Sequence, residues 1–282
     1  MGKSVIDVRG IKRPNSIAWA NRVVNAPQTT NPMFNVKTIL SRPHPASVMT
    51  VSRRFTGVSL PPSRIVHPTN EAEVTKCVWT LATAFDKVPC TNAFSAESGQ
   101  TVLNYVDKTI RHSIGANGVL VEAANASAVA LWELPALHPI VNIVPQTPYR
   151  SLGIAKQEWK QTVQQAKIKY IGTDMDPETG GGMFIRPHYH LDFLARNPHT
   201  PKTPGAISAV VVPYLARANQ DQLSVWLEAT SLDVVPLYQH FGFRVVEEIT
   251  IGVGRVDEQG RLKQGGGGVK AWLMLVDNHE SS

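Results

Sequence analysis

The sequence has few cysteines and lacks any long apolar stretch. Its 282 residues include only two cysteines, Cys77 and Cys90, which are too few for a disulfide framework. No apolar run approaches the roughly 20 residues that a membrane-spanning helix needs, and the N-terminus has no apolar core of a signal peptide. We therefore expect a protein of a reducing compartment, the cytoplasm, without a membrane partner.

Acidic residues are nearly missing from the first sixty positions. This stretch holds nine lysines and arginines but only one acid, Asp7, in a chain whose net charge is +6. It could be an extension lying on a domain, a mitochondrial import signal, or a nucleic-acid tether. Its interspersed apolar residues favour the extension, and no zinc spacing or helix-turn-helix pattern supports nucleic-acid binding. We expect a basic, proline-containing extension over 1–60, packed on a domain over 61–282.

The first part of this domain alternates between strand and helix patterns. The chain is 43% hydrophobic, enough for a well-buried core. After a short strand from Arg64, apolar residues recur at helical spacing over 70–85, with Thr69 or Asn70 as the cap. A second helix is expected over about 99–114, ending at Gly115. Residues 119–123 and 127–134 are typical of the two strands of a hairpin.

The stretch from Arg186 to Phe243 has the clearest succession of strand and helix patterns. Residues 188–195 alternate in character as in a strand, which places His188, His190 and Asp192 on one face. A loop with two prolines and a glycine leads into a helix expected over 209–218, although Pro213 lies just past its first turn. Residues 224–230 indicate a second, buried strand.

Residues 232–276 are expected to add a short helix and two further strands. A short helix is predicted over 232–241, with Asp233 as its N-cap and Gly242 as a stop in the left-handed conformation. Two further strands, 243–252 and 269–276, are joined by a flexible turn over 264–268.

The intervening segment, residues 134–184, is less regular. Residues 152–170 favour a helix with lysines and glutamines on its exposed face, and the composition of 173–182 indicates a solvated loop. The acids of this loop, Asp174, Asp176 and Glu178, lack the rest of a calcium-binding loop. We expect no metal here.

The order of elements carries a resemblance. A strand, a loop, a helix, a strand ending Leu-Glu-Ala-Thr-Ser and then Leu-Tyr-Gln-His-Phe-Gly-Phe is similar to the GNAT (Gcn5-related) N-acetyltransferase superfamily. The likeness covers roughly 64–276 and is strongest over the last third. It implies an α/β (α+β) fold with a mixed, mostly antiparallel central sheet flanked by helices. It also implies acetyl-CoA as cosubstrate and an acceptor-binding wall beside the first helices.

The resemblance assigns residues to coenzyme A. In the family a loop of the pattern Gln/Arg-x-x-Gly-x-Gly/Ala wraps the pyrophosphate, and the nearest match here is Lys202 to Ile207. Lys202 keeps a positive charge and Gly205 a close backbone approach, whereas Pro204 lacks an N–H and Ile207 replaces a small residue. The coenzyme-binding residues that the resemblance implies are Leu194, Ala195, Arg196, Lys202, Gly205, Ala206, Ser208 and Ser231.

The resemblance also suggests catalytic roles. Acetyl transfer to an amine needs a proton acceptor, donors for the oxyanion and a proton for the departing thiolate. Tyr238 matches the family's tyrosine near the thiolate sulfur. Arylalkylamine acetyltransferases of the superfamily carry His-x-His on the central strand, and His190 and Asp192 match those positions as candidate proton acceptors. Glu228, at the end of its strand, is a secondary candidate.

Other interpretations stay open. Tyr238 could be a core aromatic, and His188, His190 and Asp192 could hold zinc or iron if further ligands joined them. No second paired-histidine spacing exists, so no metal is expected. The favoured function is an acyl-CoA-dependent N-acetyltransferase acting on a small-molecule amine. The alternatives are a GNAT-like binding module that no longer holds coenzyme A, and a protein acetyltransferase whose basic extension docks an acidic partner.

Overall fold

The computed structural model describes residues 59–140, 153–175, 180 and 182–278. All of them lie in the unit Ser47–Ser282. The expected N-terminal extension therefore lies outside the described residues except for its last two positions, as do Asp176 and Glu178 of the acidic loop. Among the helices described, none is both long and apolar enough to cross a membrane.

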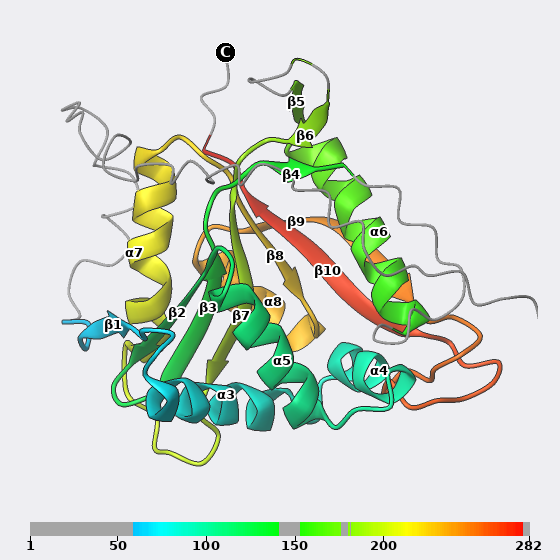
Figure 1. Ribbon diagram of the computed structural model, residues 1–282, viewed down its shortest axis with the longest axis horizontal. Coiled ribbons are helices and arrows are strands. Elements are labelled where there is room, and N and C mark those ends of the chain that lie inside the picture. Colours follow the sequence, from blue (N-terminus) through cyan, green and yellow to red (C-terminus); the bar gives the residue numbers. More distant parts are fainter. Residues whose placement is uncertain (1–58, 141–152, 176–179, 181, 279–282) are drawn as a thin grey trace, which may run out of the picture. The chain divides into compact units, whose positions relative to one another are not determined.

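A seven-stranded sheet forms the centre of the domain (Figure 1). All neighbouring strands are antiparallel except the central pair β7 and β8, which is parallel. The expected mixed, mostly antiparallel sheet is thus confirmed. In spatial order the strands are β1 (Ser63–Ile65), β2 (Gly118–Ala123), β3 (Ala128–Glu133), β7 (Tyr189–Arg196), β8 (Val225–Ala229), β10 (Val269–Val276) and β9 (Arg244–Ile251).

Helices cover both faces of this sheet, because successive strand residues point to opposite sides. Neighbours on β3 show the division: Leu131 joins one buried apolar cluster and Trp132 the other. The first cluster includes residues of α3 (Glu71–Phe85), α4 (Pro89–Glu97), α5 (Val102–Ile114) and α6 (Ile154–Tyr170), and the second includes residues of α7 (Ala206–Gln220) and α8 (Val235–His240).

Several helix ends are where the sequence places them. The side chain of Asn70 accepts from the N–H of Glu73 and caps α3, and Gly115 caps the C-terminus of α5. Gly242 has φ +96°, the left-handed conformation predicted for the residue that ends α8.

Three expectations are wrong. Helix α4 was not foreseen, because its polar residues are poor helix formers and only burial of Cys90, Ala93 and Phe94 stabilises it. The N-cap before α8 is Ser231, whose hydroxyl accepts from the N–H of Asp233 and begins a 3-10 turn, Leu232–Val234.

The third concerns the acidic loop, whose ends are strands. β5 (Thr173–Met175) and β6 (Met183–Ile185) pair with each other, and β4 (His138–Pro139) pairs with β6, in a second, three-stranded sheet. Pairing supplied by a distant segment, β4, is not visible in local composition. This small sheet and α6 form an insertion between β3 and β7.

Helix α7 continues through Pro213, which cannot donate to the carbonyl four residues earlier and disturbs the preceding turn. The indole N–H of Trp132, buried on β3, donates to the Val210 carbonyl oxygen at 3.0 Å. The Trp132 ring also stacks on Tyr214, with ring centroids 4.8 Å apart. Trp132 therefore anchors α7 to the sheet near the position where Pro213 removes a hydrogen bond of the helix.

Replacing Trp132 by phenylalanine should lower the free energy of unfolding by about 1–3 kcal/mol, because the buried Val210 carbonyl loses its indole donor. Urea denaturation measures this loss. Trp79→Phe is the matched control: Trp79 is 46% exposed, and its replacement should change stability by no more than about 0.5 kcal/mol. Equal midpoints for the two variants would contradict the anchoring role.

Candidate functional site

The two parallel strands at the centre of the sheet separate part way along. β7 and β8 pair only where Tyr189, His190 and Leu191 face Val225, Trp226 and Leu227. Both strands continue beyond this point, β7 to Arg196 and β8 to Ala229. The sheet therefore opens between them, and the backbone groups of β7 that face this opening have no partner in β8.

A β-bulge lies at the start of the opening. On β3 Leu131 and Trp132 are consecutive, but they face Phe193 and Leu191, so Asp192 is the extra residue of β7. Since N–H directions alternate along a strand, the bond from the Asn197 N–H to the Ser127 carbonyl sets the direction of the earlier amides.

Counting back from Asn197, the N–H groups of Ala195 and Phe193 point toward β3. Those of Leu194 and Arg196 point toward the opening. Of Leu194, Ala195 and Arg196, which the resemblance assigns to coenzyme A, Leu194 and Arg196 thus present donors to the opening, and Ala195 does not.

His190 lies between two carboxylates at this opening. Its Nδ1 is 2.9 Å from Glu133 Oε2 and its Nε2 is 2.9 Å from Glu228 Oε2. Carboxylates only accept hydrogen bonds, so both ring nitrogens must donate and the ring is an imidazolium. We call His190, Glu133 and Glu228 the His190 cluster.

The pKa values of the cluster agree with this charge state. Burial and Lys167 lower the pKa of His190, but Glu228 and Glu133 outweigh them and raise it to about 9. Burial raises the pKa of Glu228, but His190 lowers it to about 2. The pKa of Glu133 is likewise lowered, because His190 outweighs the effect of burial. In this arrangement His190 has no free lone pair to accept a proton.

Glu133→Gln should lower the His190 pKa from about 9 toward its ordinary value near 6.5, because one of two anions that stabilise the imidazolium is removed. NMR titration of the His190 ring measures this change. The raised pKa contributes stability that is present below about pH 6.5 and lost as the pH rises through about 9, and this loss should be smaller in the variant.

The control for this prediction is Glu247→Gln, which removes a β9 carboxylate that pairs with Lys169 at the surface. It should leave the His190 titration unchanged. If Glu133→Gln also left it unchanged, the imidazolium would not depend on the ion pair.

Asp192 has a different environment from the two glutamates. It forms no hydrogen bond or ion pair with another described residue, and it is half-buried. Burial and Glu133 raise its pKa to about 6, although His190 and Lys156 act in the opposite direction. An unpaired carboxylate with a pKa near neutrality is suited to accept and release a proton.

Helix α6 faces these groups with lysines, which corrects the prediction that its lysines are exposed. Lys156 and Lys167 are half-buried, whereas Lys160 is exposed. Burial lowers the pKa of Lys167, and Glu228 opposes that effect. The prediction is therefore wrong for Lys156 and Lys167, whereas Lys160 and Lys169 are exposed as expected.

Tyr238, on α8, packs edge-on against Phe243, with ring centroids 6.1 Å apart. Burial and the nearby charge of Glu228 raise the pKa of its hydroxyl. The hydroxyl therefore stays protonated at neutral pH and can donate a proton. The hydroxyl is thus within electrostatic range of Glu228, near the end of β8.

The loop before α7 has the backbone expected of a tight turn. Gly205 caps the helix with φ +75°, and a Cβ there would lie 3.2 Å from Leu60 and from Pro61. Lys202 is exposed, Ala206 is buried and Ser208 is half-buried. The residues that lead into β1 thus contact the turn at which the coenzyme pyrophosphate was predicted.

The sequence interpretation missed Glu133 and Lys156. Glu133 ends an apolar strand, which is a weak local indication, and only the pairing of β3 with β7 places it opposite His190. His188 was grouped with His190 but bonds elsewhere, since its Nδ1 donates to the Arg186 carbonyl at 2.8 Å. Among the residues described, no three His, Cys, Asp or Glu side chains are grouped as metal ligands.

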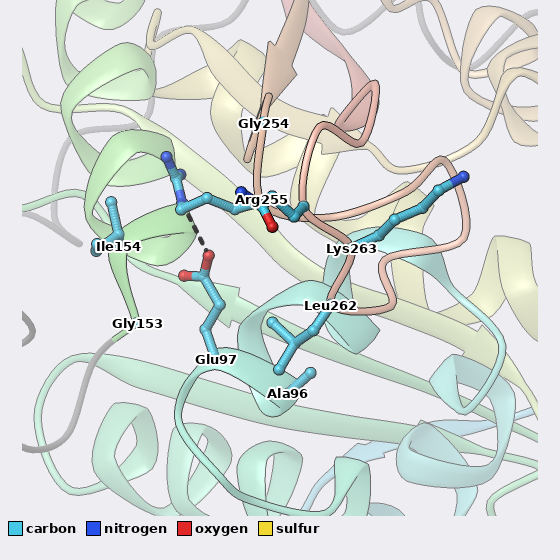
Figure 2. A pocket seen from close by; sticks show the side chains of 9 residues that line it. Ala96, Glu97, Gly153, Ile154, Gly254, Arg255, Leu262 and Lys263 are labelled. Carbon is cyan, nitrogen blue, oxygen red and sulfur yellow. Dashed lines mark hydrogen bonds and ion pairs between the residues drawn. The ribbon is translucent and has the colours of Figure 1, made fainter.

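A cavity of about 570 Å³ lies beside the N-terminus of α6 (Figure 2). Its Glu97 and Arg255 are paired, with Oε1 and Nε 3.1 Å apart, and Glu97 Oε2 accepts from the Ala155 N–H at 2.6 Å. These charges hold the first turn of α6. The lining comes from the end of α4, the start of α6 and the β9–β10 connection: Ala96, Glu97, Gly153, Ile154, Gly254, Arg255, Leu262, Lys263 and Gln264.

Comparison with known proteins gives distant matches. No known protein-family model matches the sequence. The uncharacterized protein YDR391C of Saccharomyces cerevisiae is 27% identical over 160 residues, 56% of this chain and 60% of that protein. Another protein of the same yeast is 30% identical over 88 residues, 31% of this chain and 56% of its own length. The chain thus spans less than two thirds of both relatives.

A solved structure resembles the fold. The polyamine N acetyltransferase of Drosophila melanogaster superposes with a TM-score of 0.50 at 11% identity, covering 76% of this chain and 98% of that one. At this identity the likeness shows the fold alone. The chain has the fold of the GNAT acetyltransferases, and the resemblance noted in the sequence is confirmed at that level.

Proposed function

We propose that this protein is an acyl-CoA-dependent N-acetyltransferase that transfers an acetyl group directly to a small-molecule amine in a ternary complex. The observation that supports this most is the opening between β7 and β8, which begins at the Asp192 bulge. There, backbone donors, a carboxylate without a partner among the described residues and the hydroxyl of the half-buried Tyr238 belong to neighbouring elements. Acetyl transfer to an amine needs donors for the oxyanion, a proton acceptor and a proton donor, and these groups can fill the three roles.

The donors of β7 suit the thioester. The N–H groups of Leu194 and Arg196 would hold the thioester carbonyl and the pantetheine amide, and the first of these would stabilise the oxyanion of the tetrahedral intermediate. The turn at Gly205, which opens α7, would hold the pyrophosphate with the help of Lys202. Acetyl-CoA supplies the activated acyl group when bound.

The proton transfers are assigned by charge state. Asp192 accepts the proton of the incoming ammonium, either directly or through water, so that the neutral amine attacks the thioester carbon. His190 was the other candidate acceptor, but as an imidazolium it positions Glu133 and Glu228 instead. Tyr238 donates its proton to the departing thiolate, and the second proton that the nitrogen loses as the amide forms returns Tyr238 to its neutral form. Glu228 is not assigned as an acceptor, because its oxygens accept from His190 and from the Trp226 indole.

Calorimetric titration with acetyl-CoA and with free coenzyme A tests the proposal first. We expect binding in the micromolar range, about 8 kcal/mol, followed by thiol release when arylalkylamines, polyamines or amino-acid derivatives are added. Lys202→Ala should weaken acetyl-CoA and coenzyme A alike, more so at low salt, if Lys202 meets the pyrophosphate. Lys263→Ala, a lysine of the β9–β10 connection, is the matched control.

One observation favours a second function, a binding module that no longer holds coenzyme A. Pro204 removes a donor from the turn, and Leu60 and Pro61 lie against Gly205. No heat at millimolar acetyl-CoA would support this alternative and contradict the acetyltransferase. Transfer to proteins rather than to small amines is the third reading, and the same thiol-release assay with a basic peptide as acceptor distinguishes it.

A further inference from the structure

The ammonium group of Lys156 lies among three aromatic rings. Its Nζ is 4.6 Å from the centroid of Phe94, 5.7 Å from that of Tyr105 and 5.9 Å from that of Trp159. All three distances are within the roughly 6 Å over which a cation is attracted by an aromatic face. We call Phe94, Tyr105 and Trp159 the aromatic cage.

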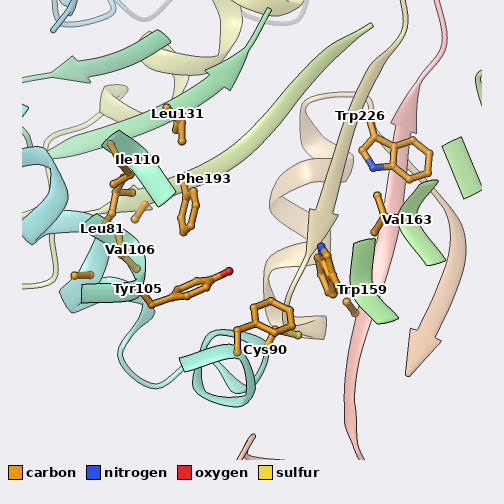
Figure 3. Packing of buried hydrophobic residues seen from close by; sticks show 14 of the residues in the cluster. Leu81, Cys90, Tyr105, Val106, Ile110, Leu131, Trp159, Val163, Phe193 and Trp226 are labelled. Carbon is orange, nitrogen blue, oxygen red and sulfur yellow. The ribbon is translucent and has the colours of Figure 1, made fainter. Parts of the chain in front are cut away.

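The cage is built from three different helices. Phe94 comes from α4, Tyr105 from α5 and Trp159 from α6, and Tyr105 and Trp159 extend toward the same space (Figure 3). Phe94 contacts both partners, with ring centroids 5.9 Å from Tyr105 and 5.4 Å from Trp159. All three rings are less than 9% exposed. The cage is therefore a packed, preformed feature of the domain.

The surroundings of the cage connect it with the opening of the sheet. Lys156 is within electrostatic range of Asp192 and Glu228, which stand where β7 and β8 separate. Gly153 and Ile154, which precede Lys156 at the start of α6, line the cavity beside α4. An ammonium in the cage is thus within electrostatic range of the carboxylate that we assign as proton acceptor.

A lysine ordinarily keeps its charged head in water and buries only its stem. Lys156 instead directs its head into the protein, while Lys160, one turn later on the same face, is exposed. Cation–aromatic contacts with a nearby carboxylate are the features by which proteins recognise ammonium ligands.

We propose that the aromatic cage is the binding site for the ammonium group of a cationic ligand, and that Lys156 occupies it in the free protein as a tethered competitor. The identification of that ligand with the acceptor amine rests on the proposed function. Binding itself does not, because the cage needs neither coenzyme A nor chemistry to hold a cation. The ligand must displace the Lys156 side chain to enter.

Tetramethylammonium tests this proposal, because it is a cation that cannot be acetylated. In Lys156→Ala the cage is vacated, and we expect tetramethylammonium to bind at least tenfold more tightly than to the wild-type protein. NMR titration of the Trp159 indole N–H, at constant ionic strength and without coenzyme A, follows the binding. The neutral molecule tert-butanol, of similar size, should bind much more weakly, since it offers no charge to the rings.

Three further variants isolate the cage. Lys160→Ala removes an exposed lysine from the same face and should bind the cation no better than the wild type. Lys156→Arg keeps a cation in the cage and should also behave as the wild type. Phe94→Leu introduced into Lys156→Ala should abolish the gain. Should Lys156→Ala fail to fold, Lys156→Gln removes the charge at similar length and is expected to bind the cation more tightly than the wild type.

The outcomes separate the two proposals. If neither neutral variant binds tetramethylammonium more tightly than the wild type, or if tert-butanol binds equally well, Lys156 is a structural lysine and the cage is not a cation site. If tetramethylammonium binds as expected but acetyl-CoA gives no heat, the cation site is supported and the acetyltransferase proposal fails. If acetyl-CoA binds but tetramethylammonium does not bind more tightly to the neutral variants, the acetyltransferase proposal is kept and the cation site is rejected.

Discussion

Asp192→Asn should lower kcat/KM for amine acetylation by roughly a hundred- to ten-thousandfold, the range for loss of a positioned base. The asparagine amide has nearly the same shape but cannot take the proton of the ammonium. In the wild type, kcat/KM should rise as Asp192 ionises with a pKa of about 6, and this step should be missing from the pH profile of the variant. A second rise at higher pH, from the amine itself, should remain in both.

A stability measurement separates loss of chemistry from loss of structure. Since burial raises the pKa of Asp192 above its ordinary value, its ionised form costs stability as the pH rises toward and through about 6. The neutral asparagine removes this cost, so Asp192→Asn should be no less stable than the wild type at pH 7. Asp86→Asn, an exposed position after α3, is the matched control and should keep full activity. An unaltered pH profile in Asp192→Asn would mean that solvent, and not Asp192, accepts the proton of the amine.

Local features of the sequence were enough for most of the fold. Alternation in side-chain character marks β7, an apolar run marks β3, and the glycine at 242 marks the end of α8, because these patterns depend on neighbouring residues only. The order of strand, loop, helix and strand after Arg186 carried the GNAT resemblance, and that resemblance implied the mixed sheet. Helix α4 was missed because its stability comes from burial against other elements and not from its own residues.

The candidate site was only half predictable, for a similar reason. His190 and Asp192 were identified, but a bulge cannot be seen in one strand, since it is a relation between β7 and β3. That relation brings Glu133 opposite His190 and converts an expected base into an imidazolium. Likewise, the face of α6 that carries Lys156 has too little amphipathic contrast to show which side is buried.

Tyr238→Phe should lower kcat by roughly ten- to a thousandfold with little change in the affinity for coenzyme A. The variant keeps the ring that packs against Phe243 but loses the hydroxyl. The hydroxyl acts late in the reaction, when the tetrahedral intermediate expels the thiolate, so its loss affects the transition state and not ground-state binding. Steady-state thiol release on a good acceptor measures kcat, and calorimetry measures the affinity for coenzyme A.

Tyr214→Phe is the matched control, because Tyr214 of α7 is also partly buried but stacks on Trp132 of β3. It should leave kcat within about twofold of the wild type, the change expected of a hydroxyl outside the site. The proposed role of Tyr238 as proton donor predicts one further difference. If the thiolate takes its proton from Tyr238, it should leave more slowly in Tyr238→Phe than in the wild type or in Tyr214→Phe. Acceptor amines of lower basicity should not restore kcat in Tyr238→Phe. If Tyr238→Phe turned over as fast as Tyr214→Phe, water would be the proton donor and Tyr238 a packing residue.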